Sequence, residues 1–129
     1  MAGDVTVRSA GLPDLATAPP PEYGGAGGQW SPETLLVAAV ADCFVLTFRA
    51  MAAASRLTWR DIECAADGVL DRTSGVVRFT QLQLRARLVV GAQEDVGRAK
   101  RLLEKAEKGC LVRNSLALQP TLDTEVAVG

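Results

Sequence analysis

Residues 31–56 read SPETLLVAAVADCFVLTFRAMAAASR, and this stretch predicts the longest helix of the chain. Ser31 is a favourable N-cap, Pro32 suits the first helical position, and Glu33 places an anion in the first turn. Apolar residues recur at three- and four-residue steps, the period of a buried helical face, and the opposite face is apolar too. A helix of this kind is covered nearly all round, which suggests a sheet on one side and a partner subunit as a candidate for the other.

Cys43 lies in the middle of this predicted helix. The simplest interpretation is structural, because free cysteines are often buried and only fill space. The helix dipole cannot activate the thiol, since Cys43 is eleven positions past Pro32 and the dipole acts only within the first turn. A reactive thiolate would therefore need a cation from elsewhere. The chain has no histidine, so that cation would be an arginine or a lysine.

Length and composition indicate an ordinary globular protein. We expect one domain over residues 1–129, with 48% apolar and 22% charged residues around a single core. A net charge of −1 gives no reason to expect a nucleic-acid or anionic-membrane partner. Asp42 and Arg49 interrupt the most apolar run, and the first residues lack the plan of a signal peptide. We therefore expect a cytoplasmic protein that does not bind membranes.

The cysteines do not follow a disulfide or metal pattern. Cys43, Cys64 and Cys110 are odd in number and widely spaced, whereas a disulfide framework uses an even set. A zinc site would need closely spaced pairs, and no histidine is present to assist. We expect no metal and no cofactor, and between zero and two functional thiols.

Residues 1–30 are expected to hold short strands near residues 5–7 and 15–17, an extended proline stretch at 18–22, and a glycine loop, YGGAGGQ, at 23–29. A phosphate-binding P-loop would end in Gly-Lys-Ser/Thr, and a dinucleotide fingerprint would need glycine at position 30, which is tryptophan. Nucleotide binding is therefore not expected. The glycines more simply give the backbone the freedom to fold against the start of the helix.

The second half of the chain predicts a hairpin, a helix and a strand. Residues 60–90 form the hairpin, with a turn at 71–75, and strict alternation along residues 82–90 implies antiparallel pairing with one face in water. Residues 94–109 form a second helix with Gly109 as its C-terminal cap, and residues 120–128 form a last strand. Helices and strands in separate runs predict an α+β fold.

Several motifs together resemble the OsmC/Ohr family of organic hydroperoxide reductases. They are GGAGG at 24–28, SPETLL at 31–36, ADCF at 41–44 and KAEKGC at 105–110, within a resemblance that spans roughly residues 22–127. The resemblance implies a swapped α+β homodimer in which long cysteine-bearing helices lie at the centre, packed against antiparallel sheet. This agrees with the helix that is apolar nearly all round.

The resemblance also implies a peroxidase that works through thiols. Cys43 would attack an organic hydroperoxide and become a sulfenic acid, and Cys110 would condense with it to a disulfide. A dithiol, lipoyl-linked in this family, would reduce the disulfide. Glu33 matches a glutamate that holds an N-terminal arginine against the thiolate. Arg8 is the only arginine before the glycine loop and is the candidate, with Arg49 or Arg56 as alternatives.

Helix geometry constrains this implied site. Glu33 and Cys43 are ten residues apart, so one helix separates them by about 15 Å. If both serve one site, Glu33 must come from the helix of a partner subunit, and the site exists only in the dimer. Asp42 would oppose thiolate formation if it faced the same way, but successive helical residues point in different directions. Leu111 replaces the proline common after the second cysteine.

Three functions remain open on these residues. The first is the organic hydroperoxide reductase. The second is a redox-sensing or ligand-binding dimer in which the cysteines form a disulfide without turnover. The third is a structural dimer whose cysteines belong only to the core. Fold alone does not distinguish them.

Overall fold

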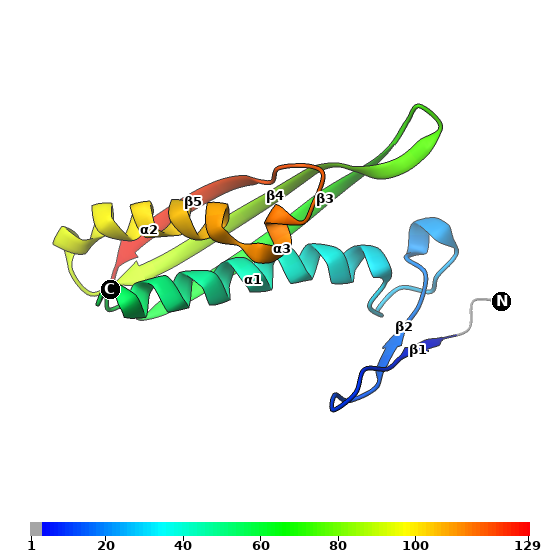
Figure 1. The fold of residues 1–129 in the computed structure, drawn as a ribbon, viewed down its shortest axis with the longest axis horizontal. Coiled ribbons are helices and arrows are strands. Elements are labelled where there is room, and N and C mark those ends of the chain that lie inside the picture. The colour runs from blue at the N-terminus through cyan, green and yellow to red at the C-terminus, as the bar shows by residue number, and fades with distance from the viewer. Residues whose placement is uncertain (1–3) are drawn as a thin grey trace. The chain divides into compact units, whose positions relative to one another are not determined.

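A long β-hairpin supplies two of the three strands of the larger sheet in the computed structural model, which describes residues 4–129 (Figure 1). Strands β3 (Asp61–Thr73) and β4 (Val76–Val90) pair antiparallel. Only Ser74 and Gly75 connect them, with φ of 51° and 79°. Positive φ at both central residues matches the twist of a two-residue hairpin turn. The five-residue turn predicted at 71–75 is therefore wrong, and β3 continues further than the sequence pattern indicated.

Strand β5 (Thr121–Val128) completes this sheet on the other side of β4, in the order β3-β4-β5. It runs parallel to β4, so the prediction of antiparallel pairing holds for β3–β4 and is wrong for β4–β5. The cause is the connection. The 3-10 helix η2 (Gln93–Asp95), helix α2 (Val96–Gly109) and helix α3 (Leu111–Asn114) carry the chain back across the sheet, as a parallel pair requires. The α+β fold class is confirmed, with a mixed sheet.

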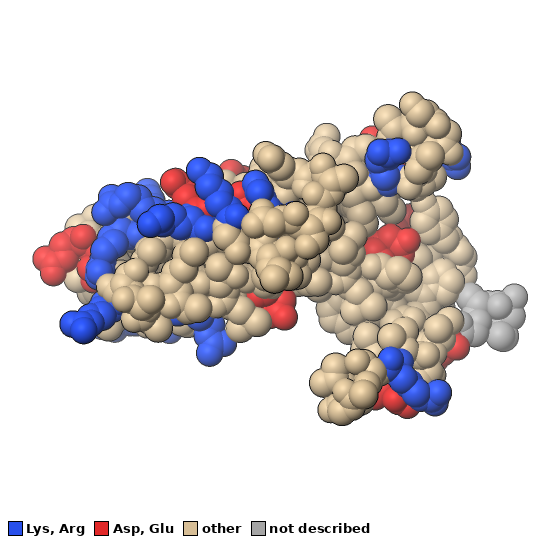
Figure 2. All heavy atoms as spheres, in the orientation of Figure 1, with Lys and Arg blue, Asp and Glu red and all other residues tan. Residues whose placement is uncertain are grey.

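The core of this part of the chain comes from alternate strand residues and one helical stripe. The buried side chains of β4 are Leu82, Leu84, Ala86, Leu88 and Val90, and those of α2 are Ala99, Leu102, Leu103, Ala106 and Glu107. Helix α2 packs on β5. Its opposite face is basic, and Figure 2 shows lysine and arginine side chains gathered over it. Helix α2 therefore has the amphipathic pattern of a helix that covers a sheet.

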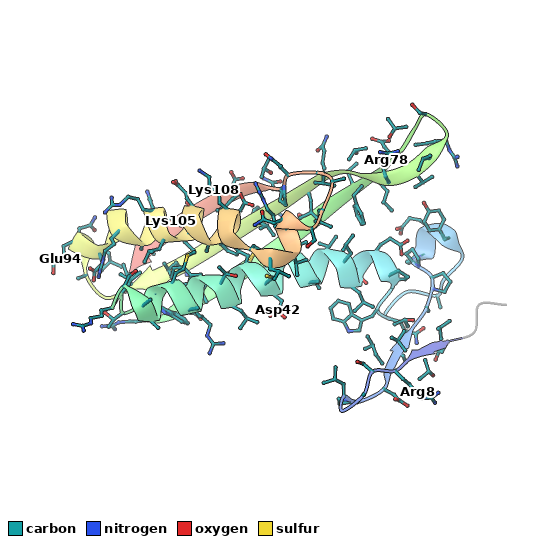
Figure 3. All side chains as sticks on the ribbon, viewed as in Figure 1. Arg8, Asp42, Arg78, Glu94, Lys105 and Lys108 are labelled. Atoms are coloured by element: carbon teal, nitrogen blue, oxygen red, sulfur yellow. The ribbon has the colours of Figure 1, made fainter. Side chains whose placement is uncertain are left out.

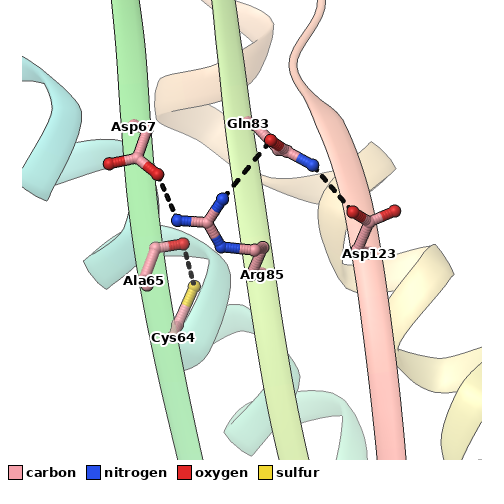
Figure 4. Close-up of polar contacts among 6 residues, drawn as sticks. All are labelled: Cys64, Ala65, Asp67, Gln83, Arg85 and Asp123. Atoms are coloured by element: carbon pink, nitrogen blue, oxygen red, sulfur yellow. Dashed lines mark hydrogen bonds and ion pairs between the residues drawn. The ribbon is translucent and has the colours of Figure 1, made fainter.

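The outer face of the sheet carries a polar network (Figure 4). Arg85 pairs with Asp67 on β3 and contacts Gln83, which donates a 2.7 Å hydrogen bond to Asp123 on β5. Arg87 lies 3.9 Å from Glu125. The sequence predicted simple solvated charges here, whereas the register places acids on both sides of the arginines. Exposed pairs of this kind add little stability.

Helix α1 (Pro32–Ala54) is buried along one stripe. Val40, Phe44, Phe48 and Ala52 recur every four residues and are fully buried, and Phe48 packs edge-on against Trp59 at 5.9 Å between ring centroids. Away from this stripe Leu46 is 49% exposed. By length and composition α1 could cross a membrane, but its buried stripe is that of a core helix. One chain covers only part of its apolar surface.

The chain forms two compact units, residues 1–38 and 39–129, and α1 runs from the first into the second. In the first unit β1 (Val5–Val7) pairs antiparallel with β2 (Leu15–Thr17), at the positions expected for short strands. The proline stretch is only partly extended, because Pro21–Tyr23 form a 3-10 helix, η1. The prediction of an extended run over residues 18–22 is therefore wrong at its end.

The glycine loop then turns tightly towards the start of α1. A Cβ on Gly25 would lie 1.7 Å from the Pro19 carbonyl oxygen, so only glycine fits there. Ser31 caps the helix reciprocally with Thr34. The Thr34 N–H donates to Ser31 Oγ at 3.1 Å, and the Ser31 N–H donates to Thr34 Oγ1 at 2.8 Å. The threonine thus takes the part that glutamate plays in a capping box.

Truncation of Leu84 tests this core. Leu84 is fully buried, so Leu84→Ala is expected to lower the free energy of unfolding by about 2–5 kcal/mol. Leu12, which is 65% exposed, is the matched control, and Leu12→Ala is expected to change it by less than about 0.5 kcal/mol. Urea denaturation followed by circular dichroism measures both. Equal losses for the two variants would contradict the placement of the core.

Candidate active site

The thiols of Cys43 and Cys110 meet in the second unit. Cys43 projects from α1, and Cys110 lies between α2 and α3. The Cys110 sulfur lies 4.0 Å from the carbonyl oxygen of Val40, one helical turn before Cys43, and each thiol is close enough to shift the pKa of the other. Neither cysteine is in a disulfide. Cys43 is partly exposed and Cys110 is fully buried. The structure therefore brings together the two cysteines that the sequence singled out, across 67 residues of chain (110 − 43).

The end of α2 reaches this position because Gly109 has no side chain. A Cβ there would lie 3.3 Å from Met51 Cε and 3.9 Å from Thr47 Cγ2, both on α1. Gly109 remains helical and its φ is not positive, so its predicted role as a left-handed cap is wrong. The helix ends instead at Cys110, where the backbone becomes extended at φ −68° and ψ 116°.

Cys110 is held as a protonated thiol. Its Sγ accepts a hydrogen bond from the Arg113 N–H at 3.5 Å and thereby caps α3. Burial and the adjacent Cys43 thiol together raise the pKa of Cys110 to about 11, although the Arg113 N–H acts in the opposite direction. At neutral pH Cys110 therefore keeps its proton, and the thiol donates towards the Val40 carbonyl on α1 at 4.0 Å.

Cys43 is the thiol that ionises first. Burial raises its pKa, but the Val112 N–H, the Cys110 thiol and the Leu111 N–H hydrogen-bond its sulfur and together bring the pKa below the ordinary value. The sequence led us to expect that a cation would stabilise the Cys43 thiolate. The structure supplies peptide N–H groups at the start of α3, a helix that the sequence pattern did not reveal.

Thr47 contributes less to the thiolate than its proximity suggests. Its Oγ1 lies 3.9 Å from the Cys43 sulfur but donates a 2.7 Å hydrogen bond to the Cys43 carbonyl. The hydroxyl has one proton, and the shorter bond takes it. The Thr47 side chain therefore mainly fixes its own rotamer on α1.

An ion pair between Glu107 and Arg113 spans the α2–α3 junction. Arg113 Nε lies 2.6 Å from Glu107 Oε2, and the two side chains are 17% and 11% exposed. The N–H is not aimed at the oxygen, so the contact is electrostatic rather than an aligned hydrogen bond. The sequence pattern predicted a role in the site for neither residue. Glu107 lies four positions after the buried Leu103 and therefore on the buried face of α2. A charged residue on a buried face usually has an oppositely charged partner, so this position could have indicated an ion pair.

Arg8 and Glu33 belong to the first unit. Arg8 Nε donates to Asp14 at 3.2 Å in an exposed pair, so its described partner is Asp14 rather than Glu33. Glu33 Oε1 is buried and has no hydrogen-bond partner within residues 4–129. Arg49 and Arg56, the alternative cations, are exposed. The roles predicted for Arg8 and Glu33 remain predictions.

Asp42 and Cys64 lie apart from the thiol chemistry. Asp42 is exposed and projects from the side of α1 away from α3 (Figure 3), as its helical position predicted. Cys64 lies on the inner face of β3, opposite Ala86, and burial raises its pKa. Within residues 4–129 no three His, Cys, Asp or Glu side chains gather as a metal site would require.

Comparison with known proteins identifies the family of this chain. The model of the family described as OsmC-like protein matches residues 25–125, a range that includes both cysteines. The chain belongs to the OsmC-like protein family. Its resemblance to OsmC and Ohr proteins, first indicated by the motifs around the cysteines, is thus confirmed.

Individual OsmC-like relatives extend this result. The uncharacterised protein YmaD of Bacillus subtilis is 30% identical over 112 residues, which are 84% of this chain and 75% of YmaD. An OsmC-like protein of unknown function from Vibrio cholerae superimposes with a TM-score of 0.85 at 20% identity, over 95% of this chain and 84% of that one. The organic hydroperoxide resistance protein OhrB of Bacillus subtilis superimposes with a TM-score of 0.68 at 17% identity, over 98% and 97% of the two chains.

The hydrogen bonds to Cys43 predict how its pKa responds to substitution. Cys110→Ala removes a donor to the thiolate, so the pKa of Cys43 should rise, whereas Thr47→Val should change it little. The pH dependence of alkylation by iodoacetamide measures this, in a Cys64→Ser background. With Cys110 present, the rate should reach half its maximum below the pH of about 8.5 expected for an ordinary cysteine. A larger effect of Thr47→Val than of Cys110→Ala would contradict this account.

Proposed function

We propose that the protein is a thiol-dependent peroxidase that reduces organic hydroperoxides, with Cys43 as the peroxidatic thiol and Cys110 as the resolving thiol. The observation that carries the proposal is the contact between a thiol with a lowered pKa and a buried thiol that keeps its proton. A selective thiol peroxidase needs this combination, because the thiolate is the nucleophile and a neighbouring thiol must capture its oxidised form.

The proposed cycle has three steps. The Cys43 thiolate attacks the outer oxygen of a hydroperoxide ROOH, and with one proton gives Cys43–SOH and the alcohol ROH. The Cys110 sulfur then attacks the sulfenic sulfur, forming the Cys43–Cys110 disulfide and releasing water. A dithiol reduces this disulfide by exchange, becoming a disulfide itself and returning both cysteines to thiols. No metal or cofactor takes part.

The surroundings of the two cysteines support an organic rather than a small polar substrate. Leu111, directly after Cys110, is 74% exposed. On the face shown in Figure 2 the surface over α3 is largely free of charged side chains. An alkyl or lipid chain bound here would bury apolar surface. Binding of this chain would place the peroxide group of the substrate beside the Cys43 sulfur.

Family relationship supports an organic hydroperoxide as the substrate. A protein from Legionella pneumophila, described as an organic hydroperoxide resistance protein OsmC, superimposes with a TM-score of 0.75 at 24% identity. We take the reductant to be a lipoyl-type dithiol and the location to be the cytoplasm, where thiols are kept reduced.

We also propose that the active form is a homodimer in which Glu33 acts in the partner's site. The exposed apolar face of α1, which includes Leu46, supports an interface between copies of this helix. The unpartnered Glu33 Oε1 supports a guanidinium arriving in the assembled protein, and Arg8 is the candidate. The exposed Arg8–Asp14 pair is weak enough to exchange for this role.

Peroxide consumption by single-cysteine variants tests the catalytic assignment. Cys43→Ser should abolish consumption of cumene hydroperoxide supported by reduced lipoamide. Cys110→Ser should permit one turnover, after which Cys43 overoxidises to sulfinic acid because no thiol captures the sulfenic acid. Cys64→Ser is the matched control and should retain activity. Loss of activity in Cys64→Ser alone would overturn the assignment.

The same experiment separates the peroxidase from a redox sensor. Mass spectrometry should find a Cys43–Cys110 disulfide after treatment with peroxide. A dithiol should reduce this disulfide to two thiols again, and the cycle should repeat through many turnovers. A disulfide that forms but does not cycle with any dithiol or monothiol would instead indicate a sensing dimer. No selective oxidation of Cys43 would leave only a structural role for the cysteines.

Mixed dimers test whether Glu33 acts across the interface. Glu33→Gln and Cys43→Ser should each be strongly impaired alone. After mixing and exchange of subunits, half of the dimers carry one variant of each kind, and one of their two sites is intact, so about a quarter of the wild-type activity should return. If Glu33 serves the site of its own chain, mixing restores nothing. A fully active monomer by analytical ultracentrifugation would also refute the shared site.

A further inference from the structure

The ion pair between Glu107 and Arg113 is placed symmetrically about Cys110. Glu107 lies three residues before the cysteine and Arg113 three residues after it. Both touch Cys110 through the backbone, since the Cys110 N–H donates to the Glu107 carbonyl at 3.4 Å and the Arg113 N–H donates to Cys110 Sγ at 3.5 Å. Their side chains then meet each other at 2.6 Å. The contacts close a ring around the cysteine.

Neighbouring contacts tie the same segment down. Arg113 Nη1 donates to Asn114 Oδ1 at 2.9 Å, and Asn114 Nδ2 donates to the Lys108 carbonyl at 3.0 Å. Helix α3 is thereby fastened to the last turn of α2 by side chains on both sides of Cys110. A helix of four residues has little stability of its own, so these contacts decide where it lies.

We infer that the Glu107–Arg113 ion pair is a positioning pair, which holds Cys110 against Cys43 and so sets how readily the two thiols join as a disulfide. The inference deepens the proposed peroxidase function, and its kinetic consequence rests on that function. Neither residue is assigned contact with substrate. Both act through Cys110 and through the position of the α3 N–H groups at Cys43.

Burial explains why this pair, rather than others, has such a role. Its side chains are the least exposed of the ion pairs in residues 4–129, whereas those of Arg85 and Asp67 are 51% and 63% exposed. Removing one partner of a buried pair leaves the other charge desolvated and uncompensated, so the local structure moves to rehydrate it. The same loss at an exposed pair is compensated by water.

The geometry also suits a cysteine that must move. To form the disulfide, the two sulfurs must approach to about 2.05 Å. A directed hydrogen bond weakens steeply when its angle changes, whereas Coulomb attraction changes slowly with distance. Arg113 Nε and Glu107 Oε2 lie 2.6 Å apart without an aligned hydrogen bond, so the pair acts through its charges. The pair can therefore guide Cys110 without locking it.

The test uses the equilibrium of the purified full-length protein with reduced and oxidised dithiothreitol, which exchanges one disulfide for two thiols and needs no peroxide. Glu107→Gln and Arg113→Met should each lower the equilibrium constant for the Cys43–Cys110 disulfide by about tenfold, because reactive groups lose effective concentration when displaced. The double variant should lose no more than either single variant, since both remove one interaction. Asp67→Asn, in the exposed pair of Figure 4, is the matched control and should leave the constant unchanged.

A purely stabilising pair gives a different result. Glu107→Gln and Arg113→Met would then unfold at lower urea concentration while the dithiothreitol equilibrium of the folded protein stayed at the wild-type value, and this outcome overturns the inference. If either variant fails to fold, Glu107→Asp and Arg113→Lys are used instead, because they move the two charges further apart and weaken their attraction, so the equilibrium constant should still fall, by less than tenfold. A wild-type equilibrium constant in those two variants also overturns it.

A peroxide arm separates this inference from the proposed function. With peroxide in excess, Glu107→Gln should accumulate more Cys43 sulfinic acid than Asp67→Asn, because capture by Cys110 is slower. If the wild-type protein does not react with peroxide, the proposed function fails while the dithiothreitol result still decides the positioning role. If peroxide is consumed normally and the equilibrium constant is unchanged, only the positioning role fails.

Discussion

The packing of the α2–α3 junction against α1 is the constraint on which the site depends, because it places the Cys110 sulfur 4.0 Å from the Val40 carbonyl and beside Cys43. It requires the chain to leave α2, turn at one extended residue and start α3 directly over α1. The same α2–α3 connection carries the chain back across the sheet to β5, which therefore pairs parallel with β4. The mixed sheet and the adjacent thiols are therefore two results of the same connection.

Peptide groups are well suited to stabilising the Cys43 thiolate in a chain without histidine. An N–H donor carries a fixed partial charge, does not titrate and needs no counter-ion. A guanidinium brought beside the sulfur would need its own charge balanced, as the Arg8–Asp14 pair illustrates elsewhere in the chain. In this protein the lowered pKa of Cys43 is already present within residues 39–129, before any contribution from Arg8.

The sequence allowed much of the fold to be predicted and less of the site. Periodicity located α1, α2 and β4, because each has a continuous pattern of buried positions, whereas the short strands at residues 5–7 and 15–17 were expected from their β-forming residues alone. The sequence pattern failed at Ser74–Gly75, where two residues suffice for the turn, and at Gly109, which is helical. It could not reveal α3, since four residues are too short for a period, nor Arg113, whose partner lies on another element. Electrostatics between elements depend on tertiary packing that one-dimensional patterns do not contain.

Gly109 shows how a missing side chain can decide how closely two helices approach. The hydrogen atom at this position lets the backbone of one helix rest against Met51 on the other. A Cβ here would lie 3.3 Å from Met51 Cε, so a larger residue would have to displace the end of the Met51 side chain beside the segment that carries Cys110. The close approach of the two helices beside Cys110 thus depends partly on the volume left empty at one glycine.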